Sequence, residues 1–164
     1  MLRYFKKSSR LLQTKISFGA TSGIVTILGL IVGLDRVTHP QSIIISGILA
    51  IAVADNISDS LGIHIYQESE GLNDKEVWFS TITNFMTRLI VSLTFILLIV
   101  LLPIKFAVPV SIAWGLFLLS MMSYSIAQAR KLNPLRAILE HLAIAVVVIF
   151  VSNSLSGWIS GKFS

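Results

Sequence analysis

Residues 89–102, LIVSLTFILLIVLL, form an uncharged and largely apolar run in the middle of the chain. Together with the amphipathic residues from position 77 onward, the run exceeds the length of about 20 residues that a helix needs to cross a bilayer. The whole chain of 164 residues is 54% hydrophobic and 13% charged, whereas about 25% of the residues in a soluble domain are charged. This composition excludes an ordinary soluble domain, a disordered chain and a nucleic-acid-binding protein, and it indicates a membrane protein.

Four further apolar stretches flank this run, and polar segments separate all five. We expect membrane spans at about residues 16–34, 42–66, 77–102, 106–129 and 137–159, after a basic cytoplasmic tail over residues 1–15. The first connection is expected to be a short polar turn that contains Asp35, Arg36, His39 and Pro40. No room remains for a second soluble domain of about 100 residues. The predicted fold is therefore all-α, with five transmembrane helices in a single domain, residues 16–164.

The basic residues indicate how the chain is oriented, because Lys and Arg accumulate on the cytoplasmic side of membrane proteins. With the N-terminus inside, ten of the thirteen fall in inner segments: Arg3, Lys6, Lys7, Arg10, Lys15, Lys75, Arg88, Arg130, Lys131 and Arg136. The outer segments hold Arg36, Lys105 and Lys162. We therefore expect a cytoplasmic N-terminus and a C-terminus outside, which requires an odd number of spans.

Two aspartates lie inside the second predicted span, within residues 48–71, ILAIAVADNISDSLGIHIYQESEG. Asp55 and Asp59 are four positions apart, so they share one face of a helix. An ionised Asp at the centre of a membrane helix costs about 3 kcal/mol on insertion scales. Such residues usually face a bundle interior or a water-filled cavity, where they bind a cation or a proton. The alternative is that the pair is bonded to Arg88 or caps a broken helix.

Oxygen-bearing side chains surround this pair and extend its polar face. Carboxylate, amide and hydroxyl oxygens suit divalent ions such as Fe²⁺, Mn²⁺, Mg²⁺ and Ca²⁺, and the absence of cysteine excludes thiolate ligands. Two glutamates directly after the span could attract cations from the cytosol. The predicted metal and proton site is Asp55, Asn56, Ser58, Asp59, Glu68 and Glu70, with His64 as a further candidate.

Two charged residues in other spans are further candidates for this site. Arg88, in the third span, either neutralises an acid of the second span or extends to the inner membrane surface, and we favour the second interpretation. Glu140, in the fifth span, either pairs with Arg136 one turn earlier or contributes a third carboxylate to the cavity. We favour the pair with Arg136 as the simpler arrangement.

The first span carries two pairs of glycines at a spacing of four, Gly19 with Gly23 and Gly29 with Gly33. Small residues at this spacing let helix backbones approach closely in lipid. These glycines either pack inside the five-helix bundle or form the seam of a homodimer. The sequence leaves both alternatives open.

The order of these features resembles the vacuolar iron transporter family over most of the chain after the basic tail. Residues 18–34, FGATSGIVTILGLIVGL, are similar to the family's glycine-rich first helix. Residues 45–71 are similar to its second helix, in which small residues lead to an acid, a serine and an acidic exit. Residues 92–104, SLTFILLIVLLPI, are similar to its third helix with the closing proline, and residues 133–161 to its fifth.

The resemblance implies a homodimeric carrier that moves Fe²⁺ or Mn²⁺ out of the cytosol in exchange for protons, along a path between the subunits. Asp55 falls where the family has its second-span glutamate, Ser58 falls on the serine after it, and Glu68 matches the polar exit. Ser22 stands where the family has a first-span aspartate, and the family's second-span methionine has no clear match. Asp59 is an additional acid that could compensate for the acid missing at Ser22.

We therefore expect a transporter in the cell (plasma or inner) membrane rather than the vacuolar membrane. The expected partners are the bilayer, a second copy of the chain and the divalent ion, with no permanently bound cofactor and no nucleic acid. The alternative is a non-transporting scaffold or partner subunit that retained the fold, which predicts aspartates bonded to Arg88 or to backbone. An enzyme is not expected, because the chain carries no HExxH, GxSxG or phosphate-binding motif.

Overall fold

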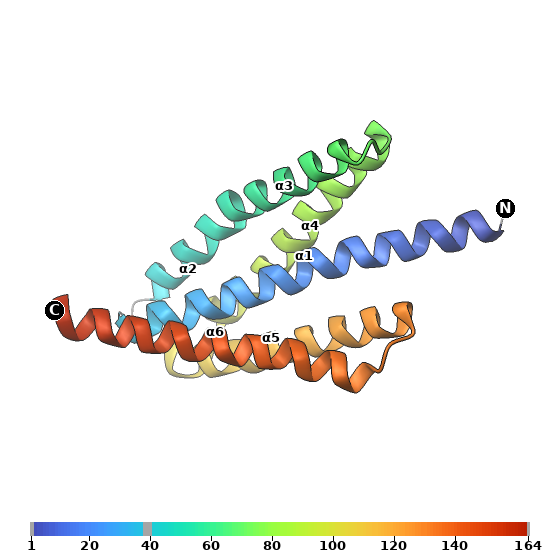
Figure 1. Cartoon of the computed structure of the whole chain (residues 1–164). Coiled ribbons are helices and arrows are strands. Elements are labelled where there is room, and N and C mark those ends of the chain that lie inside the picture. The colour runs from blue at the N-terminus through green and yellow to red at the C-terminus, as the bar shows by residue number, and fades with distance from the viewer. Residues whose placement is uncertain (1, 38–40, 164) are drawn as a thin grey trace.

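The computed structural model consists of long helices joined by short turns (Figure 1). It describes residues 2–37 and 41–163, and the side chains of residues 19–37 and 41–163. The described elements are α1 (Leu2–Val37), α2 (Gln41–Ala50), the π-helical segment η1 (Ile51–Asp55), α3 (Asn56–Ser69), α4 (Asp74–Leu101), α5 (Ile104–Arg130) and α6 (Pro134–Phe163). Because α2, η1 and α3 follow one another without a break, they form one continuous helical segment.

Within the described residues, five helical segments are long and apolar enough to cross a membrane: Gly19–Val37, Gln41–Ser69, Asp74–Leu101, Ile104–Arg130 and Pro134–Phe163. The prediction of an all-α membrane protein with five spans is therefore confirmed. The helices begin before the predicted spans and all but α4 end after them, because a helix continues past its last apolar residue until a cap or a turn ends it. Asp35 and Arg36, predicted in a turn, belong to α1, and His39 and Pro40 lie outside the described residues. The predicted basic tail is helical from Leu2 onward.

Side chains fix both ends of α4. Asn73 caps its start, since its side-chain oxygen accepts a hydrogen bond from the backbone N–H of Lys75 at 3.0 Å, one of the donors that a helix start leaves unpaired. Gln41, at the start of α2, closes the other end. Its Nε2 donates to the carbonyl oxygens of Ile99 at 2.7 Å and Leu102 at 2.9 Å. The second and third spans are therefore joined by hydrogen bonds at that end of the bundle.

The first helix packs against α4, α5 and α6, while α2 packs against both α1 and α4, and α3 packs mainly against α4. Figure 1 accordingly shows α1 between the α2–α3 segment and the α5–α6 pair. Apolar side chains form the core where these helices meet, among them Ile27, Leu28, Phe95, Ile99 and Leu119. Many other large apolar side chains are exposed, which suits surfaces in contact with lipid, whose tails are as apolar as leucine.

The four glycines of the first span face neighbouring helices of the same chain. A Cβ added to Gly19 would collide with the Asn84 side chain, and one added to Gly23 would also contact α4. A Cβ added to Gly29 or Gly33 would lie within 3.2 Å of side chains of α6. The interpretation of these glycines as a dimer seam is therefore wrong, because their surface is already used for close packing within the bundle.

The chain ends and turns are divided between the two ends of the bundle. The N-terminal end of α1, the α3–α4 turn and the α5–α6 turn lie at one end, and the C-terminal end of α6 lies at the other (Figure 1). This is the arrangement that an odd number of membrane crossings produces. It also brings together the N-terminal segment and the two turns that the sequence predicts to be cytoplasmic.

Candidate functional site

The second span changes helical type where its polar residues begin. Residues Ile51–Asp55 form a π-helical turn between α2 and α3, and the backbone N–H of Asn56 bonds to the carbonyl of Ile51, five residues earlier. A π turn accommodates one additional residue, so it rotates everything that follows relative to a continuous α-helix. Asp55 is the last residue of this turn, and Asn56 is buried directly after it. Such turns occur frequently at functional sites.

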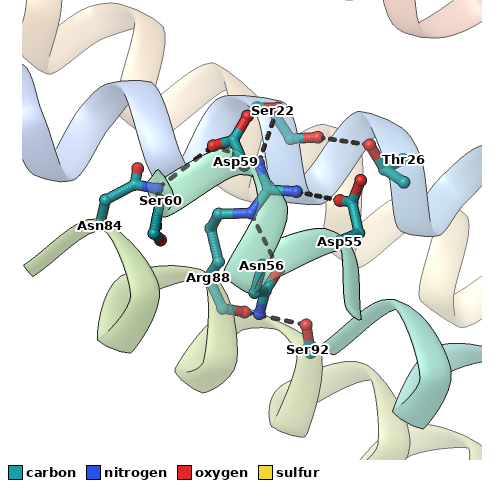
Figure 2. Close-up of polar contacts among 9 residues, drawn as sticks. All are labelled: Ser22, Thr26, Asp55, Asn56, Asp59, Ser60, Asn84, Arg88 and Ser92. Carbon is teal, nitrogen blue, oxygen red and sulfur yellow. Dashed lines mark hydrogen bonds and ion pairs between the residues drawn. The ribbon is translucent and has the colours of Figure 1, made fainter. Parts of the chain in front are cut away.

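Arg88 of α4 lies at the centre of a polar cluster formed by α1, α4 and the second span (Figure 2). Only 1% of its side chain is exposed. Its Nη2 donates to Asp55 Oδ2, and its Nη1 donates to Asp59 Oδ2 at 3.0 Å. Nη1 also donates to Ser22 Oγ at 2.8 Å, and Nε donates to Asn56 Oδ1 at 2.8 Å. One guanidinium therefore ties three membrane spans together.

The interpretation that Arg88 extends to the inner membrane surface is wrong. The guanidinium stays inside the bundle because two carboxylates give it charge-assisted hydrogen bonds there, which are roughly twice as strong as neutral ones. The alternative, neutralisation of acids in the second span, is the arrangement in the structure. Without Arg88, nine basic residues remain in the predicted inner segments against three in the outer ones, so the bias in charge persists.

Asn84, one turn before Arg88 on α4, supports the cluster from a buried position. Its Nδ2 donates to Asp59 Oδ2 at 3.2 Å and to Ser60 Oγ at 3.1 Å. Two buried amide atoms of this cluster have no hydrogen-bond partner among the described residues, Asn84 Oδ1 and Asn56 Nδ2. Buried polar atoms are nearly always paired with protein or ordered water, so one acceptor and one donor are available here for water or a ligand.

We call Asp55, Arg88 and Asp59 the Asp–Arg–Asp triad. With both carboxylates ionised, the triad carries one net negative charge. The Asp55 side chain is 44% exposed and the Asp59 side chain is 28% exposed. Arg88 bonds to Oδ2 of each aspartate, which leaves each Oδ1 as an acceptor. The geometry can therefore accept a proton or a cation on the side of the aspartates that faces away from Arg88.

Three residues of the predicted site lie apart from the triad. Ser58 is exposed on α3, and Glu68 and Glu70 are exposed at the end of that helix and just after it. Within one chain, the structure therefore brings together only Asp55, Asn56 and Asp59 of the six predicted residues, among the residues that it describes. The two glutamates lie beside the α3–α4 turn, at the end of the second span.

His64 belongs to the packing between α3 and α4. Its Nδ1 lies 3.0 Å from Thr81 Oγ1, and the Thr81 hydroxyl donates to the carbonyl of Val77 at 2.9 Å. Because that hydroxyl hydrogen is used, Nδ1 of His64 is the donor. The ring also meets Trp78 edge to face, with centroids 4.7 Å apart. These contacts explain His64 as a helix-packing residue rather than a ligand of the triad.

Glu140 and Ser22 also have partners that define their roles. The Arg136 Nε donates to Glu140 Oε1 at 2.8 Å, and both side chains are exposed. The predicted pair one helical turn apart is confirmed, and Glu140 as a third carboxylate of the cavity is wrong. Ser22 accepts a hydrogen bond from Arg88 Nη1 at 2.8 Å. A serine suits this position because an aspartate there would add a third negative charge beside one arginine.

A metal ion would find few ligands in a single copy of the chain. Among the residues that the structure describes, no three His, Cys, Asp or Glu side chains gather closely enough to hold one. The available oxygens are Oδ1 of Asp55 and Asp59 and the unpartnered Oδ1 of Asn84. Since hard divalent cations take about six oxygen ligands, ligands from water or from a second copy would have to complete the shell.

The buried residues Asn84, Ser60 and Gly19 contribute to the site, and the sequence did not assign them to it. A signal was present, because Asn84 and Arg88 are four positions apart, as are Asn56 and Ser60. Each pair therefore shares one helix face. Nothing in the sequence indicated that these two faces meet.

No protein-family model matches the chain, and no curated protein matches it. Support for a function therefore comes from the geometry of the triad and from the sequence of the spans.

Proposed function

We propose that this protein is a membrane transporter that exports a divalent cation, Fe²⁺ or Mn²⁺, from the cytosol in exchange for protons. The observation that carries the proposal is the triad, in which one arginine is shared by two partly exposed carboxylates inside the spans. A structural ion pair needs one acid for each arginine. The second acid leaves an excess negative charge, which is expensive in a membrane unless it binds a cation or a proton.

Exchange of the metal ion for protons follows because both compete for the same carboxylate oxygens of the triad. A carboxylate that coordinates a metal must be deprotonated, so binding of the ion releases any proton held there. Departure of the ion leaves the charge to be neutralised again by protons. Arg88 holds the two aspartates in place throughout, because its bonds to Oδ2 leave the Oδ1 atoms to the transported species.

We further propose that two copies of the chain assemble through the second span. Ala54, Ser58 and Gly62 recur every four residues and are all exposed, and a Cβ added to Gly62 would meet nothing within 4 Å. Small residues at this spacing allow close helix contact. Asp55 and Asp59 each follow a member of this stripe by one position. Symmetric packing would therefore bring oxygen ligands from both copies toward one path.

The proposed orientation has the N-terminus in the cytosol of a cell (plasma or inner) membrane. Nine basic residues in inner segments against three in outer ones support it. The exposed Glu68 and Glu70 would then lie at the cytosolic entrance, where negative charge raises the local concentration of cations. The resemblance of the spans to the vacuolar iron transporter family supports the same direction and the same ions.

Flux of Mn²⁺ into proteoliposomes tests the proposal, with a proton gradient imposed or absent. Asp55→Asn is the sharpest variant, because Arg88 keeps a balanced pair with Asp59 while the net negative charge is removed. We expect Asp55→Asn to lose about tenfold or more in flux, the equivalent of about 1.4 kcal/mol. The matched control is Glu140→Gln, which removes an exposed acid outside the triad and should retain the flux. Flux in Asp55→Asn that equals the wild type would contradict the proposal.

One observation favours a second candidate function. Both aspartates are bonded to Arg88, as expected for a scaffold or partner subunit in which the triad only joins the spans. This candidate predicts no Mn²⁺ flux in the wild type and no change of melting temperature when Mn²⁺ is added. A rise in melting temperature with Mn²⁺ that disappears in Asp55→Asn would exclude it.

A further inference from the structure

A groove of about 600 Å³ lies between α1, α5 and α6, at the end of the bundle where α1 ends and α5 begins. Apolar side chains from all three helices line most of it, among them Val32 of α1 and Phe150 of α6. Its charged lining residues are Asp35 and Arg36, both in the last turn of α1, and Asn153 of α6 is its other polar residue. The groove therefore combines an apolar surface with one acid and one base.

The apolar surface continues along the same three helices. A smaller open groove of about 330 Å³ is lined by α1 between Thr21 and Thr26, by Leu119 of α5 and by Ile144 of α6, and its surface is mostly apolar. Between Thr21 and Arg36, α1 rises by about 22 Å. The hydrocarbon of one leaflet is about half of the bilayer core, or about 15 Å. The two grooves together are therefore long enough for one acyl chain to lie against the protein.

The charged end of the larger groove lies where a membrane helix leaves the bilayer. Asp35 and Arg36 are at the end of the first membrane-spanning segment, Gly19–Val37. Phospholipid headgroups lie at this boundary of the hydrocarbon core. A lipid in the groove would therefore place its chain on the apolar surface and its headgroup beside the two charges.

Arg36 is positioned by packing, and its donors are available. A Cβ added to Gly157 of α6 would lie 3.2 Å from Arg36 Nε, so the guanidinium lies against α6 where a glycine leaves room for it. Arg36 forms no hydrogen bond or ion pair with the other residues that the structure describes. A guanidinium carries five N–H donors in a planar fork that fits two oxygens of a phosphate. The phosphate of a lipid headgroup is therefore a suitable partner for Arg36.

Asp35 places an acceptor beside this donor. Its carboxylate has a further interaction within the protein, but an ionised carboxylate has about four acceptor positions. It can therefore also accept a hydrogen bond from a ligand. An acid and a base side by side complement a headgroup that carries both a positive and a negative charge.

We propose that this groove binds one phospholipid whose headgroup carries a phosphate and a primary amine, as in phosphatidylethanolamine. The phosphate accepts from Arg36, the ammonium group donates to Asp35, and one acyl chain lies along the apolar surface between α1, α5 and α6. Phosphatidylcholine has no N–H donor in its headgroup, and phosphatidylglycerol has no positive charge to offset Asp35. The inference is independent of metal transport, because no residue of the triad lines the groove.

The first experiment is native mass spectrometry of the full chain with equal concentrations of these three lipids. We expect one phosphatidylethanolamine to bind about threefold or more tightly than either other lipid, a ratio within the range of partly exposed ion pairs. Arg36→Gln should weaken its binding, and Asp35→Asn should abolish the preference over phosphatidylglycerol. The matched control is Lys162→Gln, which removes a basic residue outside the groove at the same end of the bundle and should keep the preference. Equal binding of the three lipids, or an unchanged preference in Asp35→Asn, overturns the inference.

The second experiment blocks the groove and leaves both charges in place. Val146 and Val147 are neighbours on α6 whose side chains are both exposed, but only Val146 lines the groove. Val146→Trp should lower the affinity for phosphatidylethanolamine about threefold or more, because the larger side chain occupies the space of the acyl chain. Val147→Trp adds the same bulk outside the groove and should bind as the wild type does. Equal affinities of the two tryptophan variants overturn the inference, since the lipid would then lie elsewhere on the bundle.

Discussion

Replacement of Arg88 by methionine measures how strongly the triad holds the spans together. Methionine fills similar space and adapts its shape, but it donates no hydrogen bond. The variant leaves Asp55 and Asp59 as two negative charges on one helix face. It also leaves Asn56 Oδ1 and Ser22 Oγ without the donor that they have in the structure. We expect a clear loss of stability from both effects.

The size of the expected loss in the free energy of unfolding depends on how deeply the charged partners are buried. Removal of one member of a buried ion pair costs about 3–5 kcal/mol. Arg88 is buried, but the side chains of Asp55 and Asp59 are 44% and 28% exposed. Water therefore screens part of the repulsion, and we expect about 2–3 kcal/mol. At about 2–4 °C for each kcal/mol in a chain of this size, the melting temperature should fall by about 4–12 °C.

The assay is thermal unfolding of the full chain in nanodiscs, followed by tryptophan fluorescence. The matched control is Arg136→Met, which removes an arginine whose pair with Glu140 is exposed and should leave the melting temperature unchanged. A third variant combines Arg88→Met with Asp55→Asn and Asp59→Asn. It has no charge in the triad and should melt above Arg88→Met.

Two results would refute the reasoning about the triad. One is a melting temperature of Arg88→Met within about 1 °C of the wild type, since even the lower estimate exceeds that change. The other is a neutral triple variant that is no more stable than Arg88→Met. That result would show that unpaired charge on the aspartates is not the source of the loss.

Two further predictions concern packing. Gly19→Val should lower the melting temperature and weaken the hydrogen bond between Asn84 and Asp59, because a Cβ at Gly19 collides with the Asn84 side chain. The control is Gly161→Ala, where an added Cβ meets nothing within 4 Å. Equal melting temperatures of the two variants would contradict the close approach of α1 and α4. Gln41→Leu should lower the free energy of unfolding by about 1–2 kcal/mol, because two carbonyl oxygens at the end of α4 lose their donor. Backbone hydrogen exchange at the C-terminal end of α4 should become faster. Unchanged exchange there would contradict the role of Gln41 in holding that end.

The sequence predicts the number of spans because long apolar runs have one stable arrangement in a bilayer. Each run forms a helix, since lipid offers no partner for unpaired backbone groups. The five runs in the sequence therefore correspond to five helices in the structure. The pair of Arg136 with Glu140 was predictable for a related reason, because a spacing of four on a helix brings two side chains together without help from the rest of the fold.

The helix boundaries were less predictable. Hydropathy marks where a chain leaves the apolar layer, but a helix continues until a cap or turn ends it. Asp35 and Arg36 therefore lie in α1 although their charges suggested a turn. The π turn at Ile51–Asp55 had no signal in the sequence either, because the residues that form it are ordinary helix residues.

The sequence by itself determined that this is a membrane protein of five helices and that Asp55 and Asp59 share a face of the second one. Only the tertiary structure decided that the buried Arg88 lies between them and that Gly19 and Gly23 let α4 approach α1 closely. The physical reason is the range of the interactions. Helix periodicity and hydropathy act between neighbours in the chain, whereas the partner of a buried charge is set by packing between helices.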